Sequence, residues 1–185
     1  MSMRTVYLLC QEGYQIGYSH QSDEGGSAAE LGRLVSKRVA ERTLAWPLEL
    51  VLVGERAGHE MAAAVAKAHP EAKLQTSAAW DVAGPNDAGF WERVCAALDG
   101  LLQEMDAQGA GHVAVVCDGR TINAMVCHFM GRPEPDWGCP PFLVAPGSTS
   151  ALRTNPESHW GSRWVRWVND VRHLKGLGLT GDERG

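Results

Sequence analysis

Three short runs of consecutive apolar residues occur along this chain, and longer stretches of helical periodicity separate them. The apolar runs are Val6–Leu9, Leu50–Val53 and Val113–Val116. A strand that is apolar at every position, rather than at every second one, is typical of a parallel sheet that is covered on both faces. The stretches with helical periodicity are Ala28–Arg42, Glu60–Ala68, Asp87–Gln108 and Thr121–Met130.

The alternation of strand and helix predicts the fold class. Strand, helix and strand in this order form a doubly wound α/β fold, with a mostly parallel sheet flanked by helices on both faces. We expect an antiparallel edge strand near residues 160–168 and a single domain over residues 1–175. The Gly-rich, polar segment 176–185 is predicted to be a flexible tail. Segments 77–86 and 131–141 have neither periodicity, and we expect them to be loops that are candidates for lining a pocket.

The composition limits what the protein binds. The chain has 185 residues, a net charge of −5 and no dense cluster of Lys or Arg. This argues against nucleic acid or an anionic membrane as a partner and favours a small-molecule ligand. Because there is no apolar stretch of about 20 residues and no signal peptide, we expect a cytoplasmic protein. The five cysteines include no Cys-x-x-Cys pair and are expected to be reduced thiols.

Each of the three predicted strands ends in a turn that contains glycine. The turns are Cys10–Gly13, Gly54–Gly58 and Cys117–Gly119. Ligands of open α/β sheets bind beyond the carboxyl ends of the strands, so the three turns are predicted to form one pocket rim. The rim residues that carry chemistry are Cys10, Gln11, Glu12, Glu55, Arg56, His59, Cys117, Asp118 and Arg120. Because the third turn opens a helix, the backbone N–H groups of Arg120, Thr121 and Ile122 are expected to point into the site.

Five segments in order carry motifs of one known family. The segment TVYLLCQEG is a strand followed by a Gly turn, and Leu31-Gly32-Arg33 lies in the next helix. NDAGFWERVCAALDGLL is a helix with Phe90 and Arg93, and GHVAVVCDGRTINAMVCHFMGRP is a strand, a turn and a helix. The last segment, WVRWVNDVRHL, combines a strand with an Asn-Asp-x-x-His-Leu signature. In this order and spacing, the motifs resemble the histidine phosphatase superfamily, the phosphoglycerate mutase-like group, over most of the chain.

That resemblance implies which residues of a phosphatase site this chain has replaced. The family uses a His nucleophile that becomes phosphorylated, Arg residues and a second His that hold the phosphoryl oxygens, and an acidic proton donor. The first motif Arg, the nucleophile and the second His are replaced here by Cys10, Gln11 and Asp118. The second Arg aligns with either Arg56 or Gly58, and the acid donor aligns with Asp81. Because Gln has no basic nitrogen and a carboxylate repels phosphate, we predict a degenerate site without histidine-dependent phosphatase or mutase activity.

The reactive side chains of the rim favour a repurposed enzyme that acts on a small metabolite, with specialised biosynthesis as the expected setting. The predicted catalytic residues are Asp118, Gln11, Cys10, Glu12 and His59. The predicted substrate-binding residues are Arg56, Arg120, Cys117, Asp81 and Thr121. A thiolate would be the nucleophile, a carboxylate the acid or base, His59 a proton shuttle and Gln11 a hydrogen-bond donor to a carbonyl or oxyanion. These side chains also have purely structural interpretations. Cys10 and Cys117 would be packed thiols, Glu12 and Glu55 solvated carboxylates, and His59 a helix cap.

The alternative function is that of a pseudophosphatase that binds a ligand or a protein without turnover. Tryptophans would then matter as interface residues, namely Trp137, Trp160, Trp164 and Trp167. The odd spacing of Trp164 and Trp167 predicts that they lie on opposite faces of the last strand. We also expect that strand to be a sheet edge through which a homodimer forms.

A metal site is the weakest alternative. Its ligands would be Cys10, Cys117, Asp118 and His59, a set that suits Zn²⁺. These residues come from separate turns and lack a ligand-spacing motif. We therefore predict neither a metal nor a cofactor.

Overall fold

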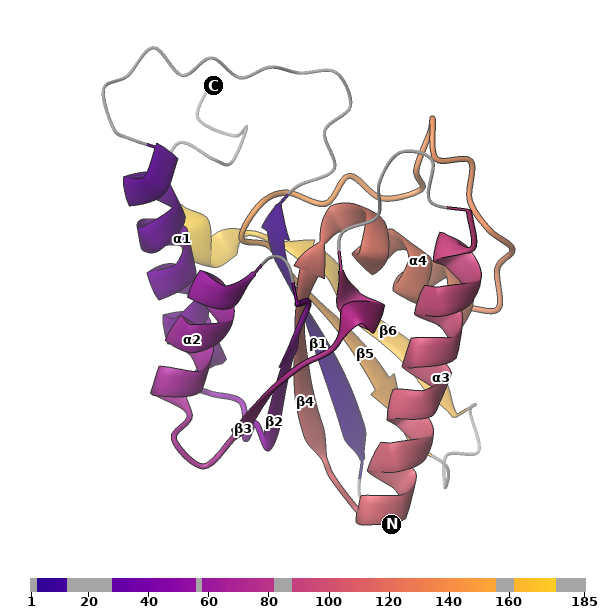
Figure 1. The fold of residues 1–185 in the computed structure, drawn as a ribbon, viewed down its shortest axis with the longest axis horizontal. Helices are drawn as coiled ribbons and strands as arrows, with labels where there is room; N and C mark the ends of the chain where they lie inside the picture. The colour runs from indigo at the N-terminus through magenta and orange to yellow at the C-terminus, as the bar shows by residue number, and fades with distance from the viewer. Residues whose placement is uncertain (1–2, 13–27, 56–57, 82–87, 156–161, 176–185) are drawn as a thin grey trace.

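The computed structural model describes residues 3–12, 28–55, 58–81, 88–155 and 162–175, with residues 12 and 28–32 described by their backbone alone. The strands are β1 (Arg4–Glu12), β2 (Leu50–Val53), β3 (Lys73–Thr76), β4 (His112–Asp118), β5 (Thr149–Thr154) and β6 (Arg163–Asp170). The helices are α1 (Ala28–Thr43), α2 (His59–Ala68), α3 (Phe90–Gln108) and α4 (Gly119–Phe129) (Figure 1). The short 3₁₀ helices are η1 (Ala78–Trp80) and η2 (Arg172–Leu174).

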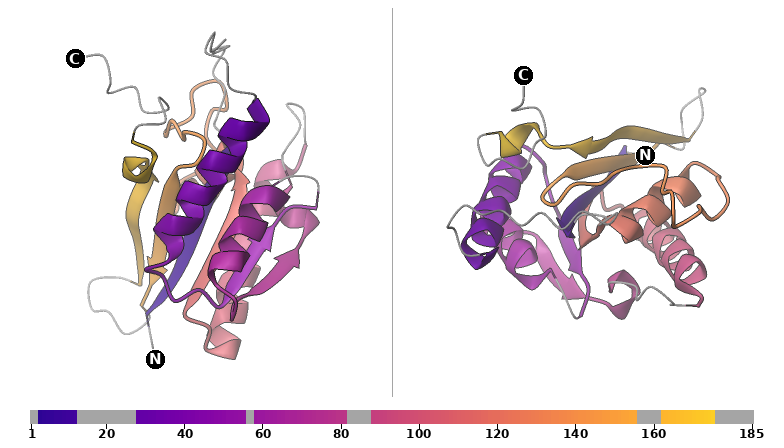
Figure 2. Two further views of the ribbon diagram at one scale, coloured as in Figure 1. Left: turned by 90° about the vertical axis from the view of Figure 1, so that its left-hand side faces the viewer. Right: turned by 90° about the horizontal axis from the view of Figure 1, so that it is seen from above.

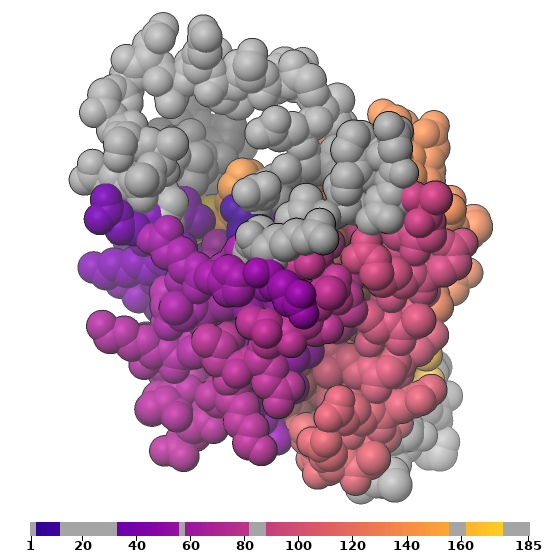
Figure 3. Space-filling model, in the orientation of Figure 1, coloured from indigo at the N-terminus to yellow at the C-terminus, as the bar shows by residue number. Residues whose placement is uncertain are grey.

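The strands form a six-stranded sheet in the order β3-β2-β4-β1-β5-β6. The first four of these strands run parallel, whereas β5 pairs antiparallel with β1, and β6 pairs antiparallel with β5. Helices α1 and α2 cover one face and α3 and α4 cover the other (Figure 2). In the space-filling view, α1 and α2 lie to the left and α3 to the right (Figure 3). The predicted fold class is confirmed, and the antiparallel edge strand is β6.

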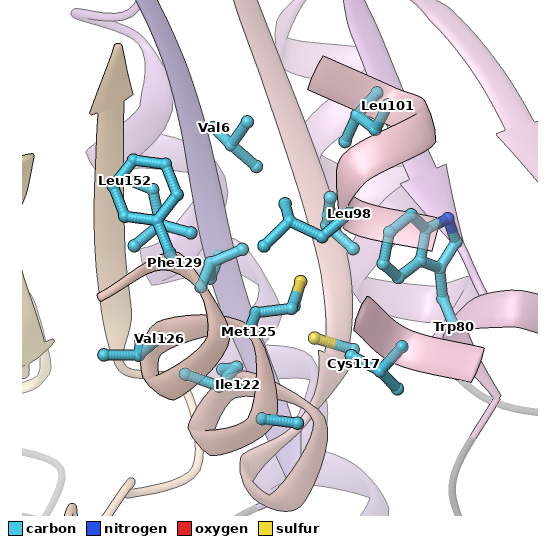
Figure 4. Packing of buried hydrophobic residues seen from close by; sticks show 14 of the residues in the cluster. Val6, Trp80, Leu98, Leu101, Cys117, Ile122, Met125, Val126, Phe129 and Leu152 are labelled. Carbon is cyan, nitrogen blue, oxygen red and sulfur yellow. The ribbon is translucent and has the colours of Figure 1, made fainter. Parts of the chain in front are cut away.

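Two apolar clusters, one on each face of the sheet, explain why the central strands are apolar at every position. Successive side chains of a strand point to opposite faces. Val6 and Leu8 of β1 pack with α3 and α4, whereas Tyr7 and Leu9 pack with α1 and α2. None of these four side chains is more than 5% exposed. Figure 4 shows the first cluster, in which Met125 of α4 lies over the sheet.

The structure differs from the prediction in two respects: strands β1 and β4 are longer than expected, and β3 and β5 were not expected. Cys10–Glu12 and Cys117–Asp118, predicted to be turns, belong to β1 and β4, and α4 begins directly at Gly119. The sequence patterns indicated neither β3 nor β5. All four residues of β3 are exposed at a sheet edge, so this strand has no apolar run. Thr149 and Ser150 of β5 are buried although they are polar, because β5 lies between two other strands.

Trp164 and Trp167 lie on the same face of β6, so the prediction that their odd spacing separates them is wrong. Trp167 pairs with Ala151 and Trp164 pairs with Arg153, and these two partners are two residues apart on β5. Paired residues of neighbouring strands share a face. A register irregularity adds one residue to β6 between the two tryptophans, and a β-bulge of this kind reverses the alternation of the side chains.

The segments predicted to be irregular have different outcomes. Residues 131–141 have no helix or strand, as predicted. Residues 77–86 contain η1 at their start, and 82–87 fall outside the described residues, as does the predicted tail at 176–185. No helix in the part of the chain that the structure describes has the length and apolarity to cross a membrane.

A charged cluster connects α1, the end of β6 and η2. Asp170 accepts hydrogen bonds from Nε and Nη2 of Arg172 at 2.9 and 2.8 Å, and its Oδ2 lies 3.6 Å from Nη2 of Arg42. The hydrogen bonds from Arg172, and next the charges of both arginines, outweigh burial and lower the pKa of Asp170 from the ordinary 3.8 to about 2. The ionised carboxylate therefore stabilises the folded state.

We expect Asp170→Asn to lower the free energy of unfolding at pH 7, because the substitution removes the carboxylate that both arginines stabilise. The loss should be only on the order of 1 kcal/mol, because Arg172 is exposed and solvent screens its charge. A lowered pKa contributes stability above the ordinary pKa, and that contribution disappears as the pH falls. The difference between wild type and variant should therefore shrink between about pH 4 and pH 2. Urea unfolding at a series of pH values measures it. A difference that stays constant across this range would contradict the assignment.

Candidate functional site

The carboxyl ends of β1, β2 and β4 meet at one edge of the sheet, as the sequence predicted. Glu12 pairs with Asp118 across β1 and β4, and Val53 pairs with Val116 across β2 and β4. The first turn of α4 and the first turn of α2 begin at the same edge. The described residues that end β1, β2 and β4 are therefore placed at one edge by parallel pairing of three strands that are distant in sequence.

Asp118 ends β4 and caps α4. Its Oδ1 accepts a hydrogen bond from the backbone N–H of Thr121 at 2.8 Å, and its Oδ2 accepts one from Thr121 Oγ1 at 3.1 Å. Asp118 is 6% exposed, and burial raises the pKa of this carboxyl although the hydrogen bonds from Thr121 and the charge of Arg120 oppose the rise. The carboxylate thus occupies the end of the helix that favours an anion.

Gln11 lies against the start of α2. A Cβ atom added to Gly58 would come within 2.3 Å of Gln11 Oε1 and 2.9 Å of Val53 Cγ2, and the φ of +88° at Gly58 is a left-handed conformation that favours glycine. Gln11 Oε1 is buried and has no hydrogen-bond partner among the described residues. An acceptor in this state is costly unless a donor reaches it. A ligand that donated a hydrogen bond here would satisfy it.

Cys10 and Cys117 are core residues. They pair across β1 and β4 and are 0% and 1% exposed. Figure 4 shows Cys117 inside the cluster on the α3 and α4 face, to which Cys10 also belongs. Burial, with smaller contributions from Asp118 and Cys10, raises the pKa of Cys117 well above its ordinary value. A neutral buried thiol is a poor nucleophile, so the arrangement favours the packing alternative.

Asp81 lies on the end of β2. It is 6% exposed, and its Oδ1 would be 2.6 Å from a Cβ atom on Gly54. Trp80, the residue before it, is 4% exposed and packs in the α3 and α4 cluster. The close approach of this segment explains the glycine at the end of β2, and it brings Asp81 to the same edge as Asp118.

His59 points away from the core. It is exposed at the first position of α2, and its Nε2 lies 2.9 Å from the backbone carbonyl oxygen of Glu55. Arg56 and the side chain of Glu12 lie outside the described residues, so their roles stay predictions. Within the described ranges, no group of three or more His, Cys, Asp or Glu side chains is arranged to hold a metal ion.

Arg120 is held between two aromatic rings. Its guanidinium carbon lies 4.6 Å from the centre of the Phe90 ring and 4.7 Å from that of Trp137, and the two rings meet edge to face at 5.5 Å. Such contacts fix an arginine by cation–π attraction. Sequence reasoning did not connect Phe90 or Trp137 with Arg120, because the three residues come from α3, α4 and the irregular segment after α4. No local pattern signals their contact.

Comparison with known proteins identifies the family. The model of the histidine phosphatase superfamily, branch 1, matches residues 52–170. The chain belongs to this superfamily. Comparison with curated protein sequences gave no match.

Solved structures share the fold of this superfamily member. YhfR of Bacillus stearothermophilus has a TM-score of 0.68 and 16% identity, over 93% of this chain and 100% of that one. The mycobacterial glucosyl-3-phosphoglycerate phosphatase has a TM-score of 0.64 and 17% identity, over 91% and 99%. The α-ribazole phosphatase of Shigella flexneri has a TM-score of 0.64 and 14% identity, over 90% and 96%. At these identities the likeness concerns the fold.

The family match covers Asp118 but begins after β1. The correspondence of Gln11 with the family's nucleophile therefore rests on the motif resemblance, and it stays a prediction. The pairing of Glu12 with Asp118 is consistent with it, because it brings the end of β1 next to the end of β4.

We expect Asp118→Ala to lower the free energy of unfolding by about 1 kcal/mol, since the substitution removes the cap of α4. Asp118→Asn should lose much less, because Asn is as good an N-cap as Asp. Chemical unfolding of both variants beside the wild type measures the cap separately from the charge. An equal loss in the two variants would show that the charge, rather than the cap, is what Asp118 contributes.

Proposed function

We propose that this superfamily member performs no phosphohistidine chemistry and binds a small molecule, uncharged or cationic, at the carboxyl edge of its sheet. The observation that carries the proposal is the buried Asp118 carboxylate at the N-terminus of α4. A helix N-terminus is a ready site for a phosphate, because its free N–H groups and its dipole favour negative charge. Here an internal carboxylate stands in place of a bound anion.

Electrostatics gives the size of the effect. Two like charges about 4 Å apart at an effective dielectric constant of 20 repel by on the order of 4 kcal/mol. A repulsion of that size weakens binding roughly a thousandfold. A phosphate ester at this edge would meet that penalty, whereas an amine or a hydroxyl group would gain an acceptor from Asp118.

Gln11 supports the same class of ligand. Its side chain has no basic nitrogen, so it cannot form a phosphoenzyme intermediate. Its buried Oε1 requires a donor, and a ligand hydroxyl, amide or ammonium group would supply one. Asp118 and Gln11 therefore both favour a ligand that donates hydrogen bonds.

The second candidate is the repurposed enzyme, and the pKa of Asp118 favours it. Burial raises that pKa, and a carboxyl with a raised pKa is suited to act as a general acid or base. Burial raises the pKa of Cys117, which disfavours a thiolate there, and Cys10 is fully buried, so the chemistry would depend on Asp118, with Gln11 and Arg120 orienting the ligand. We rank this candidate second because Thr121 already engages both oxygens of Asp118.

We expect the wild-type protein to show no turnover of p-nitrophenyl phosphate above the buffer rate and no phosphate trapped on a histidine. Acid-free gel analysis and intact-protein mass spectrometry after incubation with the substrate measure the trapped phosphate. The mycobacterial glucosyl-3-phosphoglycerate phosphatase, assayed in parallel, is the positive control. Turnover comparable with this control, together with a phosphohistidine, would overturn the proposal.

A binding measurement tests the role of the charge directly. Asp118→Asn keeps the cap and removes the negative charge, so it should bind inorganic phosphate at least about tenfold more tightly than the wild type. Isothermal titration with phosphate measures this at low salt, with Asp136→Asn, an exposed carboxylate after α4, as the matched control. Equal affinities of the wild type and Asp118→Asn would remove the main support for the proposed ligand class.

The two candidates differ in the fate of the ligand. We expect native mass spectrometry of the purified protein to detect a copurifying small molecule that is released chemically unchanged after incubation. A ligand that is converted, and whose conversion Asp118→Asn abolishes, would instead establish the repurposed enzyme.

A further inference from the structure

β6 is the outermost strand of the sheet, and one of its edges is open in the part of the chain that the structure describes. β5 occupies its inner edge, and no strand in the described ranges pairs with the outer one. Figure 2 shows β6, in yellow, as the last layer of the molecule on that side. The strand has eight residues, from Arg163 to Asp170, which is enough for a second chain to pair with it. Open edges of this kind recruit extended peptides through main-chain hydrogen bonds.

The side chains along this edge are basic. Arg163 is 46% exposed and Arg166 is also exposed. The acidic residue of the strand, Asp170, is buried and bonded to Arg172, with Arg42 close by, so it does not offset the exposed arginines. Asp99 of α3 lies 3.9 Å from Arg163 and offsets part of its charge, so Arg166 contributes more of the positive charge of this edge than Arg163 does. This local charge stands out in a chain whose net charge is −5. Charge complementarity therefore favours an acidic occupant.

The bulge in β6 adds an aromatic surface beside the open edge. Trp164 and Trp167 share one face, and both are half-buried. Trp167 packs on Trp46 and Tyr7, with ring centres 6.4 Å apart in each case, and so has a fixed position. Tryptophans of this kind are enriched where binding energy concentrates in protein interfaces. Apolar side chains of a paired peptide would pack against them.

We propose that the open edge of β6 binds an extended acidic peptide as an added strand. Main-chain pairing with residues 163–170 holds the peptide, the charges of Arg163 and Arg166 attract its carboxylates, and its apolar side chains lie on the face of Trp164 and Trp167. This function is independent of the small-molecule site, which lies at the carboxyl ends of β1, β2 and β4.

A second copy of this chain fits the edge less well than an acidic peptide does. Two β6 strands paired antiparallel around Arg166 would place the Arg166 side chains of the two copies opposite each other. Like charges that face each other across strands are destabilising. The homodimer expected from the sequence is therefore an outcome to be tested rather than the preferred occupant.

The test uses the whole protein and a fluorescein-labelled ten-residue peptide of alternating glutamate and valine. We expect fluorescence anisotropy to detect binding at low salt and a marked loss of affinity at high salt, because exposed charges are screened. The same peptide with lysine in place of glutamate should not bind. A version with N-methyl groups on every backbone nitrogen, which keeps the charge but has no backbone N–H on either edge to pair as a strand, should not bind either.

Variants locate the surface. The double variant Arg163→Glu, Arg166→Glu should weaken binding about tenfold or more. Arg166→Glu alone should weaken it less, and it leaves the contacts of Arg163 with Asp99 and Phe129 intact. Arg132→Glu, an exposed arginine after α4, is the matched control for net charge and should bind as the wild type does.

Several results would overturn the proposal. One is equal binding of the glutamate and lysine peptides; another is an equal effect of Arg132→Glu and Arg166→Glu. A third is binding of the N-methylated peptide, which would show that charge alone suffices. No binding of the glutamate peptide at low salt would mean that the arginines only protect the edge from aggregation. If sedimentation shows a dimer that Arg166→Glu alters, while the peptide does not bind, the occupant is a second copy.

Discussion

The parallel pairing of β1 with β4 is the contact on which the rest of the structure depends. Residues from Thr5 to Cys10 pair in register with those from His112 to Cys117. The pair lies at the centre of the sheet, and its side chains belong to both apolar clusters. Because the two strands are parallel, both carboxyl ends lie at the same edge, so this one pairing also places Gln11 beside the region of Asp118.

The residues at that edge are mostly engaged by the protein itself. Asp118 caps α4, the thiols of Cys10 and Cys117 fill the core, and the ring of His59 lies against a backbone carbonyl. The exception is Gln11 Oε1, which is buried without a partner in the described part of the chain. This engagement of the polar groups is what supports our proposal that the edge holds a ligand and does not transfer phosphoryl groups.

The fold was largely predictable, because a strand that is buried on both faces is apolar at every position, and that pattern is visible in the sequence. Leu50–Val53 is apolar at every position, and the structure places β2 on those residues. β3 and β5 do not show this pattern. Lys73–Thr76 lies exposed at an edge, and the buried Thr149 and Ser150 are polar, so neither strand shows the apolar run that marks the others.

The apolar runs and helical periods by themselves determined that this chain folds as a doubly wound sheet and that the residues ending β1, β2 and β4 lie at one edge. Only the tertiary structure decided what those residues do there. Cys117 has the same sequence context whether it faces a pocket or the core, and only α3 and α4 packed over it make it a core thiol. In the same way, one extra residue in β6, which no pattern reveals, put Trp164 and Trp167 on one face. Exposure, hydrogen bonding and pKa depend on neighbours from distant segments, and local sequence does not record them.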